Sequence, residues 1–123
     1  MPNRILVVDD YQALRMAITS LLRTNSMEVC GEAEDGKKAI QKVQELQPDL
    51  VLLDINMPNM DGIAAAYEIH RIAPSAKILF LTIHDSPEAF AAARLLGADG
   101  LVPKSAAGTQ LIPTVKRLLE IKH

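Results

Sequence analysis

Short runs in which every position is apolar alternate along this chain with longer segments in which apolar residues recur every three or four positions. A run without polar positions is typical of a strand covered on both faces, as in a parallel sheet. Four such runs occur, at residues 5–8, 50–53, 78–81 and 100–102, and a weaker one at 27–33 contains two glutamates. Each run is therefore predicted to be a buried strand.

The segments between these runs have the period of amphipathic helices. Their predicted core-facing positions are Leu14, Ala17, Ile18, Leu21 and Leu22; Ala39, Ile40, Val43 and Leu46; Ile63, Ala66, Ile69 and Ile72; Phe90, Ala93 and Leu96; and Leu111, Val115, Leu118 and Leu119. Five β-α units in succession, joined by right-handed crossovers, predict an α/β fold with an open, doubly wound parallel sheet.

Residues that start and stop helices agree with this division. Asp35 and Asp61 each precede a glycine at a predicted helix start, where an aspartate is a good N-cap. Gly97 is predicted to end the fourth helix. Pro113 falls inside the fifth helical pattern, so that helix is predicted either to begin late or to bend there.

Length and composition fit one domain, spanning residues 1–123. The chain has 123 residues, of which 49% are hydrophobic and 23% charged, which suits a single globular core. A net charge of −2 and only four aromatic residues argue against a nucleic-acid-binding surface in this segment. The single cysteine, Cys30, excludes an internal disulfide and a cysteine-based zinc site. The sequence has no signal peptide and no apolar run near about 20 residues, so we expect a cytoplasmic protein that does not enter the membrane.

Charged and polar side chains come just after four of the predicted strands. Asp9 and Asp10 follow the first strand, Asp54 the third, Thr82 the fourth and Lys104 the fifth. Ligands of open α/β sheets bind outside the carboxyl ends of the strands, so we expect these side chains to converge there. Three neighbouring carboxylates repel one another and need a cation. Their hard oxygen atoms favour Mg²⁺.

The same set of residues predicts phosphoryl chemistry. Lys104 is suited to bind a phosphoryl oxygen. Asp54, central in the set, is a candidate nucleophile that forms an aspartyl phosphate. The metal ion and the lysine would then offset the negative charge on the transferred group.

Four segments of the sequence resemble the receiver domain of bacterial two-component response regulators: ILVVDD at 5–10, LLDINMPNMDG at 52–62, LT at 81–82 and VPK at 102–104. The pattern D-x-x-M-P-x-x-D-G from Asp54 to Gly62 is highly specific when it occurs with the paired N-terminal aspartates. TIHD at 82–85 and GADG at 97–100 are similar to the LuxR-type subclass of transcriptional regulators. The resemblance covers essentially the whole chain. It implies a flavodoxin-like (βα)5 fold with strand order 2-1-3-4-5, and a receiver without an output domain in these residues.

The resemblance also implies a role for each site residue. Asp54 accepts the phosphoryl group, Thr82 moves its hydroxyl toward that group, and Lys104 pairs with it. In this family Mg²⁺ is held by oxygen ligands that correspond here to Asp9 or Asp10, Asp54 and the main-chain carbonyl of Asn56.

Such a protein is a signalling phospho-acceptor, not an enzyme for an external substrate, and it catalyses only its own phosphoryl transfer and dephosphorylation. The resemblance implies that a sensor histidine kinase or a small phosphodonor supplies the phosphoryl group. Phosphorylation would then shift the populations of the conformations of one face, which is built from the fourth helix, fifth strand and fifth helix. A homodimer formed on phosphorylation, and DNA contact only through an output domain outside this chain, are further expectations.

Two positions depart from the family pattern. Leu101 lies three residues before the lysine, where receivers commonly carry a switching Tyr or Phe. Ser105 follows the lysine in place of a proline, and because a cis bond before a non-proline residue costs about 3 kcal/mol, we do not expect one there. Near the mouth of the site, His84 is either a residue that controls water access to the phosphoryl group or a surface loop residue.

Three other functions compete with this interpretation. A phosphotransferase or phosphatase resembling haloacid dehalogenases would need an aspartate where Asn56 stands, because an amide cannot donate the proton. A flavin or nucleotide binder would need a glycine-rich phosphate loop after the first strand, where Asp9 and Asp10 repel phosphate. A receiver that only binds other proteins would not need the complete set of site residues, although Leu101 is compatible with it.

Overall fold

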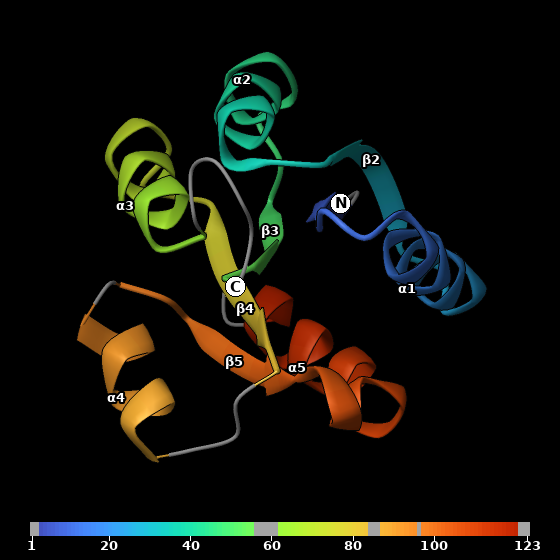
Figure 1. Ribbon diagram of the computed structural model, residues 1–123. Helices are drawn as coiled ribbons and strands as arrows, with labels where there is room; N and C mark the ends of the chain where they lie inside the picture. Colours follow the sequence, from blue (N-terminus) through green and yellow to red (C-terminus); the bar gives the residue numbers. More distant parts are fainter. Residues whose placement is uncertain (1–2, 56–61, 84–86, 96, 121–123) are drawn as a thin grey trace.

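A five-stranded parallel sheet forms the centre of the structure, a computed structural model that describes residues 3–55, 62–83, 87–95 and 97–120. In spatial order its strands are β2 (Glu28–Ala33), β1 (Arg4–Val8), β3 (Leu50–Asp54), β4 (Lys77–Thr82) and β5 (Gly100–Pro103). All four strand pairings are parallel. The predicted doubly wound sheet with order 2-1-3-4-5 is confirmed (Figure 1).

Helices cover both faces of this sheet (Figure 1). They are α1 (Gln12–Thr24), α2 (Gly36–Leu46), α3 (Gly62–Ile72), α4 (Pro87–Leu95) and α5 (Ala107–Glu120), with a short 3₁₀ turn at Lys104–Ala106 before α5. One core cluster joins α1 and α5 to alternate strand residues such as Ile5 and Val7. The other joins α2, α3 and α4 to the intervening residues, such as Leu6 and Val8. The helices therefore form two layers, with α1 and α5 on one side of the sheet.

Two of the three inner strands, β1 and β3, show why their sequences lack polar positions. Residues 5–8 of β1 and all five residues of β3 are fully buried, because helices cover both sides of each strand. The edge strand β2 has one neighbouring strand and carries the exposed Glu28. Its mixed composition explains why its hydrophobic pattern is the weakest of the five.

The helix faces differ in places from the predicted ones. In α1, Ile18 and Leu22 are buried as expected, but Ala17 is exposed. In α3, Ala65 is buried, whereas Ile63 is 41% exposed. A periodicity pattern predicts that a large apolar side chain is buried in preference to an alanine. In α3 the small alanines are buried because they allow the helix to lie close to the sheet.

Helix boundaries follow the predicted signals where the structure describes them. The Asp35 side chain accepts a hydrogen bond from the backbone N–H of Lys38 at 2.8 Å, which caps α2. Gly97 has φ +81°, the left-handed conformation expected after α4. Of the two alternatives predicted for the fifth helix, a late start is excluded, because α5 begins at Ala107 and continues through Pro113. Pro113 lacks an N–H but is exposed, so its ring lies on the solvent side of the helix.

Candidate functional site

The carboxyl ends of the central strands bring the predicted site residues together. Val8 of β1 pairs with Leu53 of β3, so Asp9 and Asp54 come next on neighbouring strands. Asp54 pairs with Leu81 of β4, which places Thr82 one residue further along the same edge. Asp9, Asp54 and Thr82 are all fully buried. The sheet therefore holds two carboxylates and a hydroxyl below the surface at one edge.

A third carboxylate completes an acidic cluster there. Asp9, Asp10 and Asp54 each contribute an oxygen, and these oxygens lie within 4.8 Å of one another. Asp10 is exposed, unlike the other two. Buried carboxylates are costly unless a cation or hydrogen-bond donors compensate their charge. The cluster is therefore open to solvent on one side and strongly anionic within.

Lys104 supplies positive charge to this cluster from the edge of the sheet. Its Nζ lies 3.1 Å from Oδ2 of Asp54 and 3.4 Å from Oδ2 of Asp9. The lysine side chain is 19% exposed. Lys104 comes directly after β5, and its long side chain reaches across the end of β4 to the carboxylates.

The donor set fits a divalent cation. One lysine cannot neutralise three carboxylates, and Oδ2 of Asp9 is buried and accepts no hydrogen bond from the described residues. Carboxylate oxygens, with one side of the cluster open to water, are the ligands that Mg²⁺ prefers. Asn56, whose main-chain carbonyl is a predicted ligand, lies outside the described residues, as do Met57, Pro58, Asp61 and His84.

Sequence reasoning missed the structural importance of Gly62. A Cβ at this position would lie 2.3 Å from the carbonyl oxygen of Asp54 and 2.3 Å from Cα of Ile55. The first residue of α3 is therefore pressed against the backbone that carries the predicted phospho-acceptor. In the sequence, Gly62 belongs to a predicted helix start and to the D-x-x-M-P-x-x-D-G pattern, and neither indicates how closely this glycine approaches the Asp54 backbone.

Two further positions bear on the departures from the family pattern. Leu101 is half-buried and packs against the core cluster that includes Phe80 and Ala93. The bond between Lys104 and Ser105 is trans, and the described residues contain no cis peptide bond.

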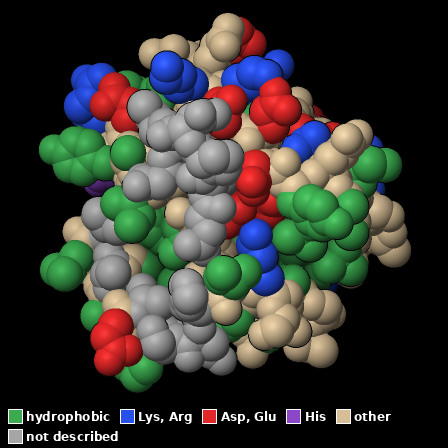
Figure 2. Space-filling model, in the orientation of Figure 1, with side chains coloured by type: hydrophobic (Ala, Val, Ile, Leu, Met, Phe, Trp, Pro, Cys, Tyr) green, Lys and Arg blue, Asp and Glu red, His purple; other side chains and the backbone are tan. Residues whose placement is uncertain are grey.

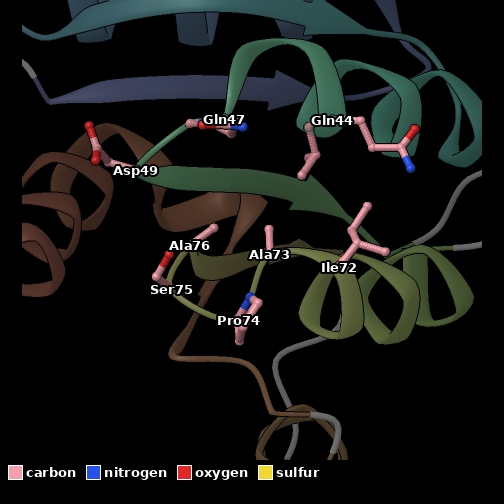
Figure 3. A pocket seen from close by; sticks show the side chains of 10 residues that line it. Gln44, Gln47, Asp49, Ile72, Ala73, Pro74, Ser75 and Ala76 are labelled. Atoms are coloured by element: carbon pink, nitrogen blue, oxygen red, sulfur yellow. The ribbon is translucent and has the colours of Figure 1, made fainter.

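A pocket also lies away from the acidic cluster, at the other end of the sheet. This pocket (Figure 3), about 480 Å³, lies between the end of α2 and the connection from α3 to β4 and is lined by residues such as Gln47 and Ser75. These residues precede β3 and β4, so the pocket is at the amino ends of the strands, opposite the acidic cluster. Figure 2 shows acidic and basic side chains interspersed over one face, with acidic side chains beside a basic one near its centre.

Comparison with known proteins identifies the class to which this fold and site belong. Residues 5–116 match the response regulator receiver domain, and the chain belongs to that family. It is 37% identical over 119 residues to the chemotaxis protein CheY of Bacillus subtilis, covering 97% of this chain and 99% of CheY.

Two other relatives are response regulators, and one of them belongs to the LuxR family. It is 34% identical over 118 residues to the response regulator protein VraR of Staphylococcus saprophyticus, covering 95% of this chain and 56% of VraR, so the chain spans about half the length of that relative. The crystal structure of a LuxR-family two-component response regulator from Aurantimonas sp. SI85-9A1 superposes with a TM-score of 0.91 at 30% identity, covering 98% of this chain and 86% of that one. Within the described part of the chain, no helix combines the length and hydrophobicity needed to cross a membrane.

Proposed function

We propose that this receiver domain accepts a phosphoryl group on Asp54, with Mg²⁺ as cofactor, and then changes the surface that it presents to a partner. One observation carries the proposal: Asp54 is fully buried within a cluster of three carboxylates and lies 3.1 Å from the Lys104 ammonium. A structural aspartate would need hydrogen bonds or one counter-ion, not two further carboxylates beside it.

The residues that would hold Mg²⁺ are those of the cluster. Asp10 and Asp54 would bind it directly, Asp9 directly or through water, and the main-chain carbonyl of Asn56 would complete the protein ligands. When bound, Mg²⁺ supplies positive charge that offsets the charge of the carboxylates and of the incoming phosphoryl oxygens.

In the transfer step, a carboxylate oxygen of Asp54 forms a new bond to phosphorus. The bond from phosphorus to the donor breaks at the same time, and its electron pair leaves with the donor. The donor is the phosphohistidine of a sensor kinase or a small acyl phosphate. Lys104 pairs with a phosphoryl oxygen, and the hydroxyl of Thr82 donates a hydrogen bond to another. Water later hydrolyses the acyl phosphate, which restores the Asp54 carboxylate.

The signal would leave through the face formed by α4, β5 and α5. Thr82 and Lys104 stand at the ends of β4 and β5, so a change in their partners at the site displaces the segments that follow them. Leu101 of β5 replaces the aromatic switch residue of other receivers, so packing of an aliphatic side chain would report the change. By likeness to LuxR-family regulators, the output is control of transcription through a DNA-binding domain and a phosphorylation-dependent homodimer.

Intact-mass spectrometry tests the proposal directly. The protein is incubated with acetyl phosphate, with MgCl₂ or with EDTA, and Asp54→Asn is treated in parallel. We expect the wild-type protein to gain the mass of one phosphoryl group only with Mg²⁺, and the variant to gain none. Equal modification of the wild type and Asp54→Asn would overturn the proposal.

A further inference from the structure

One arginine connects three separate elements beside the acidic cluster. Arg15 belongs to α1, and its side chain is 15% exposed. Its Nη1 donates a hydrogen bond to the main-chain carbonyl of Asp9 at 2.7 Å, and its Nε donates to Oε1 of Glu32 at 3.0 Å. The guanidinium therefore joins α1 to the residue after β1 and to β2. In Figure 1, α1 lies beside β2.

The carbonyl that Arg15 holds belongs to the peptide group between Asp9 and Asp10. Because a peptide group is planar, the direction of its C=O fixes the direction in which the backbone of Asp10 leaves it. Asp9 is held at two other atoms as well: its N–H donates to the carbonyl of Ala33 at 3.1 Å, and its Oδ1 accepts from the N–H of Tyr11 at 2.9 Å. Arg15 thus acts on the peptide plane that leads to Asp10.

Glu32 determines how strongly the positive charge of Arg15 acts on the acidic cluster. A free guanidinium close to three carboxylates would compete electrostatically with a metal ion. The carboxylate of Glu32, 3.0 Å away, compensates most of that charge and fixes the orientation of the planar group. The Arg15–Glu32 pair therefore carries little net charge, and its guanidinium is a hydrogen-bond donor of fixed orientation.

We propose that Arg15 is a positioning residue for Mg²⁺ binding, which rests on the proposed function of the site. Through the carbonyl of Asp9 it orients the Asp9-Asp10 peptide so that the Asp10 carboxylate faces the metal position. Glu32 holds the guanidinium in place and neutralises it. Groups that orient the ligands of a metal commonly change its affinity by about 10-fold to 100-fold when they are removed.

The test is a titration of metal-binding affinity that needs no phosphodonor. MgCl₂ is added to the wild type, Arg15→Met and Arg23→Met, and binding is followed by NMR through the amide resonance of Asp10. Arg23 is an exposed residue in the last turn of the same helix, so its variant is a matched control. We expect Arg15→Met to bind Mg²⁺ at least about tenfold more weakly than the wild type. Arg23→Met should bind it equally well.

Unfolding by urea in EDTA shows whether Arg15→Met is folded. If it is not, Arg15→Lys takes its place: a single ammonium cannot reproduce the two-pronged contact, so its affinity should also fall. Glu32→Gln should weaken Mg²⁺ binding at low salt and less at high salt, because it leaves the guanidinium charge uncompensated.

A folded Arg15 variant with the wild-type dissociation constant would overturn this proposal while leaving the proposed function standing. A wild-type protein that does not bind Mg²⁺ would overturn both. Unchanged Mg²⁺ affinity in Glu32→Gln would overturn the role assigned to Glu32.

Discussion

Replacing Gly62 with alanine is a sharp test of how α3 is seated against the site. The new Cβ would lie 2.3 Å from the Asp54 carbonyl oxygen and from Cα of Ile55, and 2.9 Å from the Asp54 carbonyl carbon. Ordinary van der Waals contact begins at 3.4 Å, so the start of the helix must retreat by roughly 1 Å. Helix propensity alone would favour alanine by about 1 kcal/mol, but overpacking against backbone atoms costs about 1–3 kcal/mol or more.

Because the gain in helix propensity offsets part of the overpacking, we expect Gly62→Ala to lower the free energy of unfolding by up to about 2 kcal/mol. Gly108→Ala is the matched control, because Gly108 also lies in the first turn of a helix but a Cβ there meets no atom within 4 Å. That variant should gain up to about 1 kcal/mol. Urea unfolding followed by far-ultraviolet circular dichroism measures both, with an unchanged slope showing that the same surface is exposed. A Gly62→Ala protein as stable as Gly108→Ala would show that α3 does not press against the Asp54 backbone.

Three further predictions concern single side chains. Lys104→Met leaves Asp9 and Asp54 without their cation, so it should lower the free energy of unfolding in urea by up to about 3 kcal/mol. MgCl₂ should restore part of this loss. A variant as stable as the wild type in the absence of Mg²⁺ would contradict the ion pairs of Lys104 with the two carboxylates. Thr19 is 4% exposed, and its hydroxyl has no hydrogen-bond partner among the described residues. Thr19→Val should therefore raise the free energy of unfolding by about 1 kcal/mol, whereas a loss would show that the hydroxyl is satisfied. Burial raises the pKa of the Cys30 thiol, so less thiolate is present at a given pH and iodoacetamide should react more slowly than with a cysteine peptide. A rate profile against pH that matches the peptide would contradict this.

The strands and the main site residues could be predicted because both leave direct traces in the sequence. A strand buried on both faces must be apolar throughout, as residues 50–53 are. The residue that follows such a run must stand at the sheet edge, which is how Asp54 and Lys104 were found. Parallel topology then brings together residues far apart along the chain.

Other features depend on contacts that no sequence pattern encodes. The partner of Arg15 at the site is a main-chain carbonyl, which every residue has, so the identity of Asp9 gives no sign of the contact. The constraint on Gly62 comes from how closely α3 approaches the backbone of Asp54. Periodicity placed Ile63 in the core because it weighs hydrophobicity and not the space available beneath the helix.

Locating the modified residue shows whether Asp54 itself forms the acyl phosphate. The protein is treated with acetyl phosphate and MgCl₂, reduced with borohydride so that an aspartyl phosphate becomes homoserine, digested and sequenced by mass spectrometry. We expect homoserine at position 54, and none in samples treated with EDTA. Homoserine at position 9 or 10, with Asp54 intact, would contradict this expectation.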